Sequence, residues 1–205
     1  EEIIEHIIRK YAEVAAFVKQ CGFGMINLHG GHGWLMTQFM DPHNTRTDRW
    51  GGSLENRMRF PVEVIRALRK AMGEKYLLVV NAPNIGGPMG MDMDEAAAFL
   101  RAIDPYIDLL QVRGQHPDHE RVTVCESAEL SKGLKARGVK TPIAISTYYK
   151  DLDSLNGVIA SGAADLVAPG HLFICNEHLG EILRDGNGED LNPCIECHAC
   201  RGTSS

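Results

Sequence analysis

The chain has 205 residues, of which 44% are hydrophobic, and its 27 acidic side chains outnumber 21 basic ones, giving a formal net charge of −6. This length and composition are typical of a globular domain with a substantial core. The acidic balance argues against nucleic-acid or anionic-membrane partners, because both require clustered Lys and Arg. No apolar run approaches the roughly 18 residues that a membrane span requires, so we expect a cytoplasmic protein with a small-molecule substrate.

The chain opens in an amphipathic helix and then alternates apolar strands with amphipathic helices. Apolar side chains recur at helical spacing from Ile3 to Val18. The predicted strands are 25–28, 76–81, 107–112, 142–146 and 164–168. The predicted helices between them are 53–72, 94–103, 127–136 and 151–161. This alternation indicates parallel βαβ units, and the nearly continuous apolar strands indicate a sheet that is covered on both faces.

Polar or glycine-rich sequence follows every predicted strand. These segments are 29–33, 81–84, 113–116, 146–148 and 169–171. Potential site residues after five successive strands are typical of the C-terminal face of a (β/α)8 barrel, whereas an open sheet concentrates them at one switch point. No GxGxxG dinucleotide fingerprint follows a strand. The pattern therefore favours an α/β protein built as a TIM barrel.

Two histidines three residues apart, His29 and His32, lie on the glycine-rich loop after the first predicted strand. Their imidazoles can converge on one oxygen atom or one metal ion. A zinc ion would need a further ligand, and no acidic residue stands at a suitable spacing. Polarisation of a substrate carbonyl by the pair is equally consistent with the residues, as is a structural role in which both rings bond to the backbone.

Residues 29–57 carry a longer motif: His-Gly-Gly-His-Gly-Trp-Leu-Met-Thr-Gln-Phe, and then Asn-Thr-Arg-Thr-Asp-Arg-Trp-Gly-Gly-Ser-Leu-Glu-Asn-Arg. It closely resembles the old yellow enzyme family of FMN-dependent oxidoreductases, whose pattern is H-x-x-[HN]-G-Y-L-x-x-Q-F followed by N-x-R-x-D-x-[YW]-G-G-S-x-x-N-R. The resemblance implies a partial (β/α)8 barrel, about strands four to eight, with FMN across its C-terminal mouth. Arg46, Asp48 and Arg57 are expected to build the scaffold of the loop and helix.

The resemblance also implies the reaction and its catalytic residues. His29 and His32 match the pair that hydrogen-bonds the oxygen of an α,β-unsaturated carbonyl or enoyl-CoA-like substrate. Hydride then passes from NAD(P)H through the flavin to the alkene. Trp34 stands at the position of the family's tyrosine proton donor, and an indole N–H is too weak an acid for that step. The donor is then water, Tyr148 or His171.

Contacts with the flavin are expected from six residues: Asn81, Ser146, Thr147, Pro169, Gly170 and His171. Asn81 replaces an arginine that faces the flavin pyrimidine, and His171 replaces an arginine at the flavin phosphate. Asparagine can hydrogen-bond the pyrimidine edge but cannot offset the negative charge of a reduced flavin. Phosphate binding then rests on backbone N–H groups around Gly170 and Thr147.

Three of the six cysteines form a C-x2-C-x2-C trio: Cys194, Cys197 and Cys200. The spacing fits an iron–sulfur cluster that lacks its fourth cysteine, a zinc site completed by His198, or three free thiols. In the family branch that resembles 2,4-dienoyl-CoA reductase and trimethylamine dehydrogenase, such a motif follows strand eight and binds a 4Fe-4S cluster. The resemblance thus divides the chain into a partial FMN-binding barrel, 1–185, and the beginning of a cluster segment, 186–205. It implies FAD and NAD(P)H for a longer parent protein.

A competing interpretation is an inactive, cofactor-free half-barrel. Five of eight strands leave two open sheet edges that can pair with another copy, so we expect a homo-oligomer. The flavin interpretation predicts a coloured protein, the half-barrel a colourless oligomer, and the zinc site stoichiometric zinc without visible absorption. The chain begins inside a helical pattern and ends just after the cysteines, and we interpret it as a piece of something longer.

Overall fold

A computed structural model describes residues 1–86, 90–113, 123–195, 197 and 199–201. Its five strands are β1 (Met25–Leu28), β2 (Leu77–Asn81), β3 (Leu109–Val112), β4 (Ile143–Ile145) and β5 (Leu166–Val167). Its α-helices are α1 (Glu2–Gln20), α2 (Leu35–Met40), α3 (Leu54–Met72), α4 (Met93–Ile103), α5 (Val124–Ala136), α6 (Leu152–Ala160), α7 (Gly170–Cys175) and α8 (Leu179–Asp185). Short 3-10 helices are η1 (Asp104–Tyr106), η2 (Gly188–Asp190) and η3 (Ala199–Arg201).

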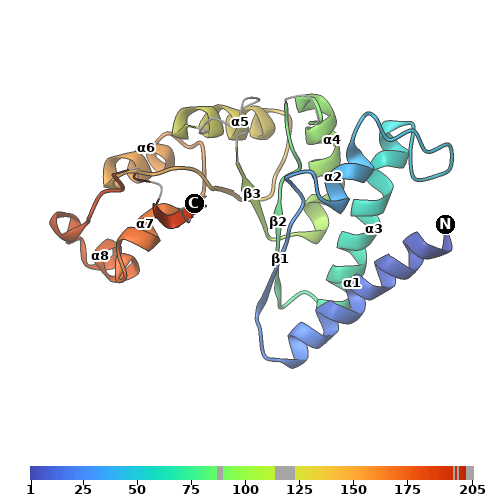
Figure 1. Cartoon of the computed structure of the whole chain (residues 1–205), viewed down its shortest axis with the longest axis horizontal. Coiled ribbons are helices and arrows are strands. Elements are labelled where there is room, and N and C mark those ends of the chain that lie inside the picture. The colour runs from blue at the N-terminus through green and yellow to red at the C-terminus, as the bar shows by residue number, and fades with distance from the viewer. Residues whose placement is uncertain (87–89, 114–122, 196, 198, 202–205) are drawn as a thin grey trace.

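The strands form one parallel sheet in the order β1-β2-β3-β4-β5. Helices α3, α4, α5 and α6 follow one another around the outside of this sheet (Figure 1). Sequential parallel strands with helical crossovers on one side form part of a (β/α)8 barrel, which confirms the predicted fold class. Within the described residues, no helix has the length and apolar character that a membrane crossing requires.

The two faces of the sheet differ in their surroundings. The face toward the helices holds six aliphatic side chains that are at most 1% exposed: Leu78, Val80, Leu110, Val112, Ile143 and Ile145. The opposite, inner face exposes about half of the side chains of Met25, Leu77 and Leu166 near the start of the strands. Because side chains alternate along a strand, each strand contributes to both faces.

Local capping signals explain where the helices begin and end. The Ser53 hydroxyl accepts a hydrogen bond from Asn56 N at 3.3 Å, so α3 begins and ends within one residue of the prediction. Helix α5 begins at Val124, three residues before the predicted start, because Thr123 and Glu126 form a capping box. The last four strands are one to three residues shorter than predicted at one or both ends. Helices α2, α7 and α8 were not predicted.

An ion pair joins α3 to β3 at the end of the sheet where the strands begin. Arg69 on α3 donates to an Asp108 carboxylate oxygen at 2.5 Å and to the carbonyls of Tyr106 and Tyr76 at 2.7 and 2.8 Å. The same oxygen of Asp108 accepts Leu78 N–H at 2.7 Å. This network ties β2 and β3 to α3, and it lies at the opposite end of the strands from the polar loops.

Candidate active site

The loop that follows β1 lies directly against the end of β2. A Cβ atom at Gly30 would overlap the carbonyl oxygen of Asn81, and one at Gly31 would lie 3.1 Å from the carbonyl oxygen of Ala82. The Thr37 hydroxyl on α2 donates to the Gly30 carbonyl at 3.1 Å and holds the loop from the other side. Glycine at these two positions therefore allows the approach that brings the histidine loop to β2.

A hydrogen-bonded chain of three side chains runs from β2 to the second histidine. The Asn81 Nδ2 atom lies 3.0 Å from His29 Nδ1, and His29 Nε2 lies 3.1 Å from His32 Nδ1. An amide nitrogen can only donate, so His29 accepts at Nδ1 and donates from Nε2. His32 then accepts at Nδ1, which leaves its Nε2–H available as a donor.

The backbone and the charge state of His32 support this arrangement. Its φ of 60° lies in the left-handed region, and its backbone N–H donates to Asn84 Oδ1 at 2.7 Å. Burial lowers the pKa of His32, and electrostatic repulsion involving the neighbouring His29 and Arg113 lowers it further. A neutral imidazole with one acceptor and one donor nitrogen is the form that the hydrogen-bonded chain requires.

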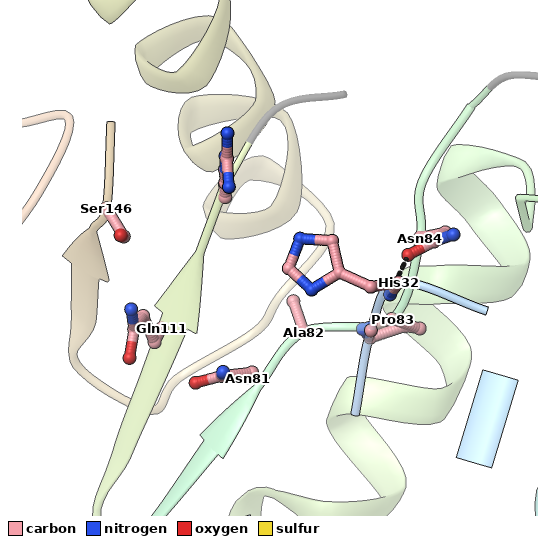
Figure 2. A pocket seen from close by; sticks show the side chains of 9 residues that line it. His32, Asn81, Ala82, Pro83, Asn84, Gln111 and Ser146 are labelled. Atoms are coloured by element: carbon pink, nitrogen blue, oxygen red, sulfur yellow. Dashed lines mark hydrogen bonds between the residues drawn. The ribbon is translucent and has the colours of Figure 1, made fainter. Parts of the chain in front are cut away.

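His32 lies in a pocket at the ends of β2, β3 and β4, with a volume of about 190 Å³. Figure 2 shows its imidazole directed into this space, between Asn84 and the side of the pocket formed by Gln111 and Ser146. The pocket is lined by Gly31, His32, Asn81, Ala82, Pro83, Asn84, Gln111, Arg113 and Ser146. It is smaller than the roughly 300–1,000 Å³ of sites for drug-sized ligands.

The structure divides the predicted site residues into two groups. His32, Asn81 and Ser146 line the pocket, and His29 joins it through the hydrogen-bonded chain. The other predicted flavin contacts do not line it and follow β4 and β5: Thr147, Pro169, Gly170 and His171. Gly170 N–H donates to the Ala168 carbonyl at 3.1 Å.

The three residues considered as proton donors also lie outside the pocket lining. Trp34 precedes α2 as its N-cap, and 65% of its surface is exposed. The Tyr148 hydroxyl lies 2.7 Å from Cys194 Sγ, and its ring centroid is 4.6 Å from that of His171. The hydroxyl of Tyr148 is thus turned toward the cysteine segment.

Sequence reasoning missed Asn84, Gln111 and Arg113 as site residues. All three lie in or beside the polar segments after predicted strands, which was the available signal. Asn84 fixes the backbone of His32, and Gln111 Oε1 accepts from Asn27 Nδ2 at 3.3 Å on the inner face. Their importance depends on contacts between different strands, which sequence spacing does not reveal.

Arg57 has the expected scaffolding contacts. The residue is 6% exposed, and its guanidinium donates to the Met40 carbonyl at 2.7 Å, the Gly52 carbonyl at 3.2 Å and Glu95 Oε1 at 2.6 Å. Arg46 pairs with Asp48 in the preceding loop. These contacts join the loop before α3 to α2 and α4, away from the pocket.

The cysteine trio lies near a fourth thiol on α7. Burial raises the pKa of Cys175, and a hydrogen bond with Cys194 and the charges of the trio raise it further. Even so, no three His, Cys, Asp or Glu side chains in the described part of the chain are placed to hold a metal ion. His198, the fourth ligand of the zinc alternative, lies outside the described residues. Both metal assignments stay predictions.

The structure thus places paired histidines at the strand ends of a partial α/β barrel, and comparison with known proteins identifies the family. Residues 1–188 match the NADH:flavin oxidoreductase / NADH oxidase family. The chain therefore belongs to this family.

Individual relatives agree with this assignment. The chain is 30% identical to an NADH oxidase of Thermoanaerobacter brockii over 95% of its own length and 31% of the relative's. It is 31% identical to an NADPH dehydrogenase of Clostridium acetobutylicum over 92% of its length and 56% of the relative's. A solved 2-naphthoyl-CoA reductase complex superposes with a TM-score of 0.84 at 27% identity, covering 95% of this chain and 31% of that one. The chain thus spans between about a third and just over half of these relatives.

Proposed function

We propose that this chain carries the substrate-polarising part of an FMN-dependent ene-reductase, which reduces an α,β-unsaturated carbonyl or enoyl-CoA-like compound with electrons from NAD(P)H. The observation that carries the proposal is the Asn81–His29–His32 hydrogen-bonded chain, which ends at a neutral imidazole in a pocket. A donor at His32 Nε2 would hydrogen-bond the carbonyl oxygen of the substrate. It would stabilise the negative charge that develops on this oxygen when the β-carbon accepts a hydride.

The residues beside the histidines fit a flavin. The buried Oδ1 atom of Asn81 has no hydrogen-bond partner among the described residues. An unsatisfied buried acceptor favours a ligand with an N–H group, and the pyrimidine edge of a flavin carries one. Asn81 and Ser146 would therefore contact the ring, with Thr147, Pro169, Gly170 and His171 toward its phosphate. Bound FMN would supply the hydride.

We assign the proton for the α-carbon to water. This assignment is supported by the positions of Trp34, Tyr148 and His171 outside the pocket lining, and by the contact of the Tyr148 hydroxyl with Cys194. A neutral imidazole at His32 remains bound to the carbonyl oxygen throughout, so it is not required to release a proton.

The decisive experiment is the reduction of 2-cyclohexenone by the FMN-loaded chain under anaerobic conditions with NADH or NADPH. We expect His29→Ala and His32→Ala to lower the rate by about 100-fold, because a preorganised donor at a developing oxyanion contributes at that level. His43→Ala is the matched control, because this histidine is exposed and pairs with Asp41 outside the pocket. Equal rates in all variants would overturn the role of the histidine pair.

The 4Fe-4S cluster is a separate part of the proposal, and no step above depends on it. It is supported by the C-x2-C-x2-C spacing of Cys194, Cys197 and Cys200. Iron and acid-labile sulfide after anaerobic reconstitution would test it, with Cys197→Ser as the test variant and Cys125→Ser as the control. Stoichiometric zinc would instead favour the zinc alternative. A colourless oligomer, detected by sedimentation, would favour the inactive half-barrel. The cytoplasmic location of the protein stays a prediction.

A further inference from the structure

Arg113 is the permanently charged side chain among the described residues that line the pocket, and none of these residues carries a carboxylate. It forms no hydrogen bond or ion pair with another residue of the described ranges. This local excess of positive charge occurs in a chain whose formal net charge is −6. A guanidinium without an anion in a concave site is typical of a place where a ligand supplies the anion.

The backbone places Arg113 at the pocket through strand contacts. The Gln111 carbonyl accepts Ala82 N–H at 2.8 Å, and the Val112 carbonyl accepts Ser146 N–H at 2.9 Å. The two residues before Arg113 are thus held by the strands on both sides. Since side chains alternate along a strand, Arg113 faces the same side as Gln111, toward the pocket.

Two other arginines show what a structural arginine looks like in this fold. Arg57 donates to two carbonyls and Glu95, and Arg69 donates to three carbonyls and Asp108. In both guanidinium groups each of the three nitrogens donates to at least one acceptor, and these contacts join secondary-structure elements. Arg113 has no such acceptor in the described part of the chain, so the contacts described there assign it no scaffolding role.

We propose that Arg113 binds a carboxylate of the substrate, so that the site selects unsaturated carbonyl compounds that also carry a carboxylate group. This inference rests on the proposed function, because His32 in the same pocket would hold the carbonyl oxygen. A planar guanidinium can bind both oxygens of a carboxylate at once, which fixes the orientation of the substrate as well as its affinity. The charge of Arg113 already acts on the pKa of His32, so an anion bound there would lie within electrostatic reach of the imidazole.

The test compares the binding of crotonate and of its neutral analogue crotonamide to the 205-residue chain, followed by NMR titration at low salt. We expect Arg113→Gln to weaken crotonate binding roughly 10- to 100-fold and to leave crotonamide binding unchanged, because a charge-assisted hydrogen bond contributes at that level. Arg113→Lys should retain part of the preference, since it keeps the charge but not the two-pronged geometry. Arg9→Gln is the matched control, because it removes the same charge from an exposed position on α1.

Either of two results would overturn the inference: equal binding of the two probes by the wild-type chain, or an equal loss of crotonate binding in the Arg9 and Arg113 variants. The reduction of neutral 2-cyclohexenone separates this inference from the proposed function. If that reduction depends on His29 but crotonate binding is independent of Arg113, the function stands and the carboxylate site fails. If crotonate binding depends on Arg113 but no enone is reduced, the carboxylate site stands and the function fails.

Discussion

The two faces of the sheet are made by the same strands but differ in what their side chains do. On β3, Leu110 points toward the helices and is fully buried, whereas its neighbour Gln111 points to the inner face and lines the pocket. On β2, Val80 and Asn81 divide in the same way. Along these strands, side chains that stabilise the core alternate with side chains that line the pocket. Substitutions of adjacent residues on one strand should therefore have separable effects on stability and on the site.

The largest difference in the free energy of unfolding is expected between the Leu110→Ala and Gln111→Ala variants. The first removes a fully buried side chain and should lower the free energy of unfolding by about 2–5 kcal/mol. The second loses a hydrogen bond with Asn27 and should cost at most about 1 kcal/mol. Urea denaturation followed by circular dichroism would measure both. Similar losses in the two variants would contradict the division of labour between the faces.

A smaller loss of stability is expected at the end of the sheet where the strands begin. Asp108→Ala removes the acceptor for Arg69 and for the backbone N–H of Leu78, and should cost about 1–3 kcal/mol. Because this network lies away from the pocket, crotonate affinity measured below the unfolding transition should not change. A variant of normal stability would show that this network does not stabilise the sheet. A variant that folds but loses crotonate affinity would show that the two ends of the strands are not independent.

A still smaller effect concerns the pKa of His32. Since the charge of Arg113 helps to lower this pKa, Arg113→Gln should raise it, and Arg9→Gln should not. NMR titration of the His32 ring protons would measure the shift. The lowered pKa of His32 also determines how stability changes with pH. At pH values between this lowered pKa and the ordinary pKa of the unfolded state, the unfolded chain binds more protons than the folded chain. Stability should therefore rise with pH through that window, and a rise in His32→Asn of the same size would contradict this origin.

The smallest expected effect is that of Trp34→Phe on enone reduction, which should leave the rate within about twofold. A general acid that delivers the proton contributes about 100-fold or more, so a loss of that size would assign the proton to Trp34 instead of water. Leu35→Met, at the first residue of α2, serves as a control for disturbance of the helix itself.

The βαβ pattern and the strand-end loops could be predicted because hydrophobic periodicity and glycine placement are local properties. The earlier start of α5 was also present in the sequence, since Thr123 and Glu126 have capping-box spacing. Helices α7 and α8, at six and seven residues, are too short for periodicity to reveal them.

Contacts between distant residues could not be predicted. His29 and Asn81 are 52 positions apart, and the motif assigned one to the substrate and the other to the flavin. The structure joins them in one hydrogen-bonded chain that fixes a tautomer. Likewise, a lone arginine after a strand resembles many surface arginines until the described lining of the pocket is seen to hold no carboxylate.

The left-handed backbone of His32 restricts which residues evolution or a mutagenesis library can place there. Histidine and asparagine are among the few side chains that adopt a positive φ at low cost, and both carry an N–H that can reach a substrate oxygen. The family motif allows these same two residues at this position. A saturation library at residue 32 should therefore recover histidine and asparagine, while glycine retains the fold without the donor and valine loses both.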